Sequence, residues 1–189
     1  MAHYPVGLGR PDWPTPTSVF AVLSKEENPV WDVPKSIQEE MRRCGQRVKT
    51  RVPPGPDNTL GEYCIGLSLG GYGIHGTIAP ASIYQFGSHG CIRLHPDDIT
   101  DLFGRVSIGT PGHIIYTSVL LARLTNDQIY LEVHRDVYKR AGDPLTSVQR
   151  IAGSEGIGQL LDWQQIEEVI RLKDGVAREV SRQPRRALD

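Results

Sequence analysis

The 189-residue sequence lacks the features that mark several large classes of protein. It has no uninterrupted apolar run approaching the ~20 residues that a membrane-spanning helix needs. Its 21 Lys and Arg residues nearly balance its 22 Asp and Glu residues, which gives a net charge of −1. The basic cluster from Arg182 to Arg186 is at the C-terminus, where a solvated tail is the simpler interpretation. Since nucleic acids select for a basic surface, we expect no nucleic-acid partner.

Cysteine is scarce, with only three residues, and an odd number leaves one thiol unpaired when the other two form a disulfide. Cys44 follows Ile37 and Met41 at helical spacing, which predicts that it completes an apolar stripe. Cys64 interrupts a strand-like alternation and therefore faces the opposite side of that strand. Whether Cys44 and Cys64 form a disulfide stays undecided at this point, because the sequence does not give the distance between them. Cys91 is then the candidate reactive thiol.

The most informative residues surround Cys91, in the run Ser88-His89-Gly90-Cys91-Ile92-Arg93, which follows the short segment His75-Gly76-Thr77. Together they supply a thiol, two imidazoles and a guanidinium, as an acyl-transfer site requires. Because a thiol attacks as the thiolate, we expect His75 or His89 to lower the pKa of Cys91. Gly90 lets the backbone turn sharply, so that N–H groups can point at a developing oxyanion.

A metal site is a weaker interpretation of the same residues. His75, His89, Cys91 and His95 form a zinc set on paper, but His89 and Cys91 are separated by one residue, and no CxxC or HExxH spacing is present. The nearby glycines do not form a GxxxxGK[ST] phosphate loop. We therefore expect neither a metal nor a cofactor.

The two segments resemble the active-site signature of the L,D-transpeptidases, the YkuD-type enzymes that cross-link bacterial peptidoglycan. The similarity extends over about residues 4 to 140 and includes Tyr4-Pro5-Val6-Gly7-Leu8-Gly9, Trp13-Pro14-Thr15-Pro16, Val52-Pro53-Pro54-Gly55-Pro56-Asp57-Asn58 and Gly109-Thr110-Pro111-Gly112. The segment Tyr130–His134 is similar to the extension of the ErfK/YbiS-like periplasmic branch of Gram-negative bacteria.

The resemblance assigns roles to the site residues. It makes Cys91 the nucleophile and His75 the general base, and it places the backbone N–H groups of His89, Gly90 and Cys91 in an oxyanion hole. The supporting residues are Ser88, Arg93, Gly76 and Thr77. Ser88 either anchors the loop by hydrogen bonding or is only a turn residue with local bonds. Thr77 either anchors the carbonyl or imidazole of its neighbour or has the same local role. Arg93 either holds a carboxylate of the substrate or fixes the loop through backbone carbonyls.

The resemblance also implies a reaction in cell wall biogenesis. Cys91 would attack a peptidoglycan stem tetrapeptide donor and form a thioester, which passes to an acceptor stem peptide or to a lysine of an outer-membrane lipoprotein. Carbapenems are the expected inhibitors. Water as the acceptor would make the protein an L,D-carboxypeptidase or amidase. A truncated, inactive peptidoglycan-binding relic is an alternative of a different class.

The implied fold class is mainly β, a YkuD-type β-sandwich with a few short helices and a C-terminal helical appendage. We expect a catalytic domain over residues 1–125, an extension over 126–178 and a disordered tail over 179–189. Local patterns predict helices over 34–44, 96–104 and 163–173 and strands over 60–78, 112–121 and 128–134, with a loop over 79–88.

The first residues differ from the family pattern. Family members usually carry a strand pair ahead of the motif that begins at Tyr4, so the resemblance implies that N-terminal strands are missing here. Residues 1–5 have neither the basic nor the apolar region of a secretory signal. The resemblance nevertheless implies a periplasmic location.

Overall fold

The computed structural model describes residues 2–182 and divides into two compact units, Met1–Ile115 and Tyr116–Asp189. The division falls after residue 115 rather than after residue 125, because strand β10 (Val119–Arg123) pairs with β11 (Ile129–Val133) inside the second unit. Of the tail expected over 179–189, residues 179–182 are described and continue the second unit, and residues 183–189 lie outside the described part.

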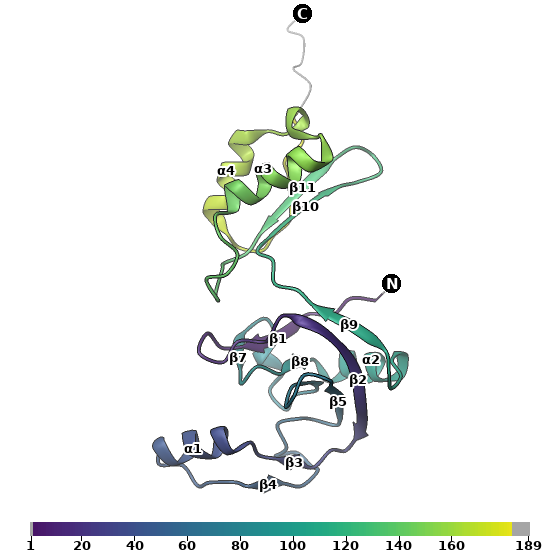
Figure 1. Ribbon diagram of the computed structural model, residues 1–189, viewed down its shortest axis with the longest axis vertical. Coiled ribbons are helices and arrows are strands. Elements are labelled where there is room, and N and C mark those ends of the chain that lie inside the picture. The colour runs from purple at the N-terminus through teal and green to yellow at the C-terminus, as the bar shows by residue number, and fades with distance from the viewer. Residues whose placement is uncertain (1, 183–189) are drawn as a thin grey trace, which may run out of the picture. The chain divides into compact units, whose positions relative to one another are not determined.

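A seven-stranded sheet forms the first unit. In order across the sheet, its strands are β7 (Phe86–Ser88), β1 (Val6–Gly9), β8 (Ile92–Leu94), β6 (Gly73–His75), β5 (Tyr63–Leu67), β2 (Ser18–Glu27) and β9 (Pro111–Ile114). The first part of β2 pairs with β9 and its second part with β5, and the register shifts between Val22 and Ser24. The long strand visibly curves (Figure 1), as a bulged strand does. The predicted mainly β class is confirmed.

The pleat of this sheet separates a core face from a polar face. Ile65 and Leu67 of β5 point into the core, where Ile99 of helix α2 (Pro96–Arg105) is buried with them. Cys64 and Gly66 alternate with them and face the other side. The expected loop over 79–88 contains a 3-10 turn, Pro80–Ser82, and then β7. Packing on the core face stabilises the sheet, and the polar face is available for a functional site.

Residues 29–60, which we call the α1 segment, leave the sheet after β2 and return before β5. They contain β3 (Trp31–Asp32), helix α1 (Lys35–Arg43) and β4 (Arg51–Val52), which pairs with β3. The helix follows Pro34 and ends before Gly45, as the sequence predicts. At the base of the segment the buried amide of Asn58 donates to the carbonyls of Pro29 and Pro53 at 2.8 and 3.2 Å.

The second unit has its own sheet and core. Strands β10, β11 and β12 (Arg178–Glu179) pair in that order, beside α3 (Pro144–Glu155), a 3-10 turn (Gly158–Leu160) and α4 (Trp163–Leu172). The helix predicted over 163–173 is confirmed, and Asp162 caps it by accepting from the backbone N–H groups of Gln164 and Gln165. The expected helical appendage thus also contains a sheet. Within residues 2–182, no helix combines the length and apolarity needed to cross a membrane.

Candidate active site

Neighbouring strands place the predicted site residues on the polar face of the first unit's sheet. His75 of β6 is paired with Arg93 of β8 on one side and with Cys64 of β5 on the other. Cys91 precedes Arg93 by two residues, so strand periodicity keeps both on this face. All four side chains line a cleft of about 810 Å³, and the α1 segment supplies the opposite wall.

The candidate catalytic loop, residues Ser88–Cys91 and called the catalytic loop below, is held in a tight turn. Gly90 has φ +98°, and a Cβ there would lie 2.4 Å from Cε1 of Tyr72, so only glycine fits. The Ser88 hydroxyl donates to the Cys91 carbonyl at 2.6 Å and accepts from the Gly90 N–H at 3.1 Å. The N–H of Gly90 is therefore already bonded, which contradicts its expected place in the oxyanion hole. The N–H groups of His89 and Cys91 are the remaining candidates.

The thiol of Cys91 is not activated in the way the sequence suggests. Burial raises its pKa, and the smaller opposing effects of the Gly73 backbone and the Arg93 charge do not reverse this. The expectation of a lowered thiol pKa is therefore wrong for the free protein. Desolvation destabilises the thiolate more than the Gly73 backbone and the Arg93 charge stabilise it. Cys91 rests as the neutral thiol.

The imidazole of His75 is also neutral at rest. Its ring is buried, and burial lowers its pKa to about 4, with Arg93 acting in the same direction. Nδ1 lies 2.6 Å from the carbonyl oxygen of Gly76. A carbonyl only accepts, so Nδ1 carries the proton and Nε2 keeps its lone pair. His75 is thus held in the tautomer that a general base needs.

The supporting residues divide by their contacts. The Thr77 hydroxyl accepts from the N–H of Ala79 at 3.0 Å, a local turn contact, and the carbonyl of Gly76 orients His75. Arg93 is half-buried, and its Nε is buried with no hydrogen-bond partner among residues 2–182. Its charge is therefore available to the cleft.

All three cysteines are free thiols. Cys64 faces the opposite side of β5 from Ile65, as predicted, and this side lines the cleft, where burial raises the pKa of Cys64 to about 12. Cys44 is exposed at the end of α1 and lines the cleft together with Ile37 and Met41, the two residues whose apolar stripe it is predicted to complete. The Cys44–Cys64 disulfide that the sequence leaves open is therefore not formed in this structure.

A contact that the sequence does not reveal joins the two walls of the cleft. Glu40 of α1 lies with Oε2 2.5 Å from Nε2 of His89 and with Oε1 2.7 Å from Nη1 of Arg10. Hydrogen bonds from Arg10 and His89 hold the pKa of Glu40 at about 2. The His89 ring also meets Trp13 edge-on, with centroids 4.5 Å apart. Glu40 and His89 are far apart in the sequence, and no local pattern connects them.

Comparison with known proteins agrees with this arrangement. The family model of the L,D-transpeptidase catalytic domain matches residues 1–114, more than half of the chain, and this range includes the whole cleft. The chain belongs to the L,D-transpeptidase family.

Two curated relatives are named as L,D-transpeptidases. The chain is 32% identical to the probable L,D-transpeptidase YcfS of Escherichia coli, over 95% of its own length and 58% of that protein. It is 33% identical to the probable L,D-transpeptidase ErfK/SrfK of Salmonella typhimurium, over 94% and 59%. It therefore spans less than two thirds of either relative. A solved L,D-transpeptidase of Mycobacterium smegmatis is 26% identical, covers 61% of this chain and 49% of its own, and superposes with a TM-score of 0.49.

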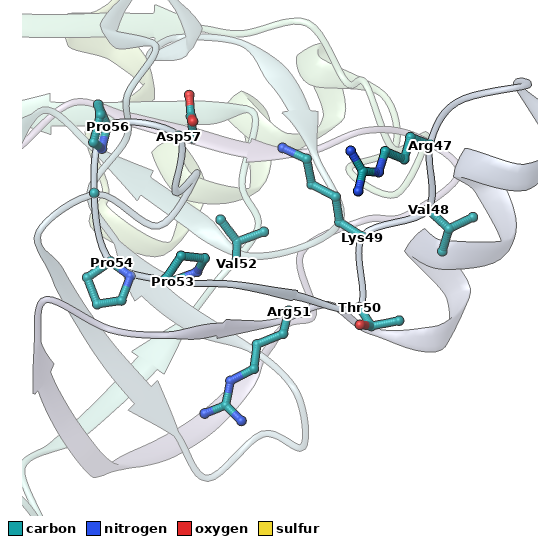
Figure 2. Close-up of a pocket in the computed structure, with 11 residues that line it drawn as sticks. Arg47, Val48, Lys49, Thr50, Arg51, Val52, Pro53, Pro54, Pro56 and Asp57 are labelled. Atoms are coloured by element: carbon teal, nitrogen blue, oxygen red, sulfur yellow. The ribbon is translucent and has the colours of Figure 1, made fainter.

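A second cavity in this L,D-transpeptidase domain lies outside the cleft. It encloses about 410 Å³ and is lined by residues 47–57, including Arg47, Lys49 and Arg51. Residues 42–51 carry five basic side chains and no acidic one, and they form a basic cluster in addition to Arg182–Arg186. Figure 2 shows Arg51 pointing to the opposite side of the backbone from Lys49, so these charges do not converge on one ligand. In the described part of the chain, no three His, Cys, Asp or Glu side chains are grouped to hold a metal ion.

Proposed function

We propose that this protein is a peptidoglycan L,D-transpeptidase that works through a thioester on Cys91. The observation that carries the proposal is the presence of a neutral thiol and a buried imidazole in one cleft, the imidazole being fixed by the Gly76 carbonyl with Nε2 unprotonated. Such a pair transfers a proton as the thiol attacks, so that no buried thiolate has to exist beforehand.

In the first half-reaction, Sγ of Cys91 attacks the carbonyl at the L-centre of the third stem residue, and Nε2 of His75 takes the thiol proton. The N–H groups of His89 and Cys91 stabilise the oxyanion. Collapse of the intermediate breaks the amide bond to the terminal D-Ala, whose amine leaves with the proton from His75. The product is a thioester, and the imidazole is neutral again.

In the second half-reaction, an amine attacks the thioester while His75 accepts a proton from it. The proton then passes to the departing Cys91 sulfur, and a new amide bond remains. The acceptor in our proposal is another stem peptide or a lysine of an outer-membrane lipoprotein. The protein would act in the periplasm, as the family resemblance implies.

Arg93 has a distinct part in the proposal. Its buried Nε has no hydrogen-bond partner among the described residues. A donor stem carries free carboxylates, which a guanidinium recognises through paired hydrogen bonds. We assign Arg93 to such a carboxylate rather than to the loop.

Incubation with a carbapenem, followed by mass spectrometry of the intact protein, tests the thioester step. The wild-type protein should gain the mass of one drug molecule, Cys91→Ser should gain none, and Cys44→Ser, a control on the exposed thiol of the same cleft, should react as the wild type does. Labelling that persists in Cys91→Ser would refute the nucleophile assignment. Incubation with a stem tetrapeptide and an amine acceptor then separates transfer from hydrolysis, since the latter yields only tripeptide.

A further inference from the structure

The catalytic loop is bonded to the opposite wall of the cleft through a single carboxylate, that of Glu40. One of its oxygens lies against His89, which directly precedes Gly90 and Cys91. The other accepts from Arg10, whose backbone N–H donates to the carbonyl of Ser88 at 3.0 Å. The two oxygens therefore hold the first two residues of the loop, His89 directly and Ser88 through Arg10.

The position of α1 depends on these contacts more than on packing. None of the nine residues of the helix is buried, so it has no apolar anchor of the kind that usually docks a helix. Its cleft-facing side is formed by Ser36, Ile37, Glu40 and Met41. Glu40 is the member of this group that bonds to residues outside the α1 segment.

An ordinary surface ion pair would contribute little, but this contact differs in two ways. The side chains of Arg10, Glu40 and His89 are only 26%, 24% and 25% exposed, so solvent screens them incompletely. Both oxygens are bonded at once, at 2.5 and 2.7 Å, to nitrogens on two different elements. Such shared, charge-assisted bonds are stronger and more directional than neutral ones.

We propose that Glu40 is a positioning residue that closes the α1 segment onto His89 and Arg10 and thereby holds the catalytic loop in its reactive conformation. The inference rests on the proposed function, because it gives the loop its catalytic task. In this proposal, the Glu40 carboxylate determines the position of α1, which forms one wall of the cleft. The same carboxylate also determines the position of the backbone N–H donors near Cys91.

Hydrogen exchange tests the positioning without any turnover. Glu40→Gln keeps the size of the side chain but loses its charge, and Glu39→Gln removes a charge from the exposed neighbouring position of the same helix. We expect amides in α1 and in residues 88–91 to exchange roughly tenfold faster in Glu40→Gln, because the amide carries no charge to pair with Arg10 and has only one acceptor oxygen for the two nitrogens. Glu39→Gln should match the wild type. Unchanged exchange in Glu40→Gln would overturn the proposal, whether or not the protein is an active transpeptidase.

A double-mutant cycle tests whether Glu40 acts through His89. His89→Phe keeps a ring against Trp13 but removes the nitrogen that faces Glu40. Each single change should slow carbapenem acylation roughly tenfold, and the double variant should be no slower than the slower single one. If the two effects multiply, Glu40 does not act through His89, and the proposal fails. If the wild type itself is not acylated, the proposed function fails, while the exchange experiment still decides the role of Glu40.

Discussion

At the residue scale, Cys91 and His75 are more deeply desolvated than a motif can indicate. Burial raises the pKa of the thiol and lowers that of the imidazole, and both shifts favour the neutral forms. A site of this kind performs proton transfer during attack instead of storing an ion pair. It also protects the thiol from reagents that require a thiolate.

The pKa of His75 predicts the pH dependence of acylation. A general base must be unprotonated, and the pKa of about 4 keeps the imidazole neutral well below its usual value of 6.5. The rate of carbapenem acylation should therefore hold from neutral pH to about 5 and fall as the pH approaches 4. His75→Ala should react roughly 10²–10⁴ times more slowly and should lack this acid limb. Stopped-flow acylation between pH 3.5 and 8, with circular dichroism to check folding, measures both. An acid limb near pH 6.5 would contradict the assignment.

The candidate reactive residues stand out in the sequence because they lie in two short motifs. Their protonation states could not be predicted from it, since burial depends on residues distant in the chain. The same holds for Glu40, whose partners Arg10 and His89 come from separate elements. The N–H of Gly90 is a further case, because the Ser88 hydroxyl competes for it at close range.

At the element scale, residues that mark helix boundaries make the helices predictable from the sequence. Pro34 and Gly45 bracket α1, and Asp162 begins α4. Helix α3 has comparable signals in Asp143, which caps it, and in Gly156, which ends it with φ +66°, so attention to these two residues would have found it.

Strand β2 is harder to predict from its sequence. Apolar residues occur on both of its faces, and Val19 and Leu23 are 70% and 60% exposed, so the strand shows no simple alternation. The partners of β2 change along its length, and a sequence pattern contains no information on that change.

The base of the α1 segment leads to a prediction for Asn58. Its fully buried amide donates to the carbonyls of Pro29 and Pro53, and its oxygen accepts from the N–H of Leu60 at 3.0 Å. Asn58→Ala leaves these buried groups unpaired and should lower the free energy of unfolding of the first unit by ~2–3 kcal/mol. Hydrogen exchange in α1 should rise as well. Denaturant unfolding and exchange measure the effect, and Asn126→Ala, at an exposed amide of the second unit, is the control. Equal losses in both variants would mean that the Asn58 contacts do not secure the segment.

At the scale of the whole molecule, the two units have separate hydrophobic cores. The core of the first unit centres on Ile65, Leu94 and Ile99, and that of the second on Leu131 and Ile166. No residue belongs to both clusters. The reactive cleft is built entirely from residues of the first unit.

Separate cores predict separate responses to cavity-forming changes. Ile65 and Ile166 are 1% and 0% exposed, and truncation of either to alanine should cost ~2–5 kcal/mol in its own unit. Ile65→Ala should lower the melting transition of the first unit and reduce the fraction of protein that a carbapenem acylates near that transition. Ile166→Ala should lower the transition of the second unit and leave acylation unchanged. Calorimetry combined with acylation at each temperature separates the two effects. If Ile166→Ala reduced acylation as much as Ile65→Ala does, the reactive cleft would depend on the second core, and the two units would have to be treated as one cooperative domain.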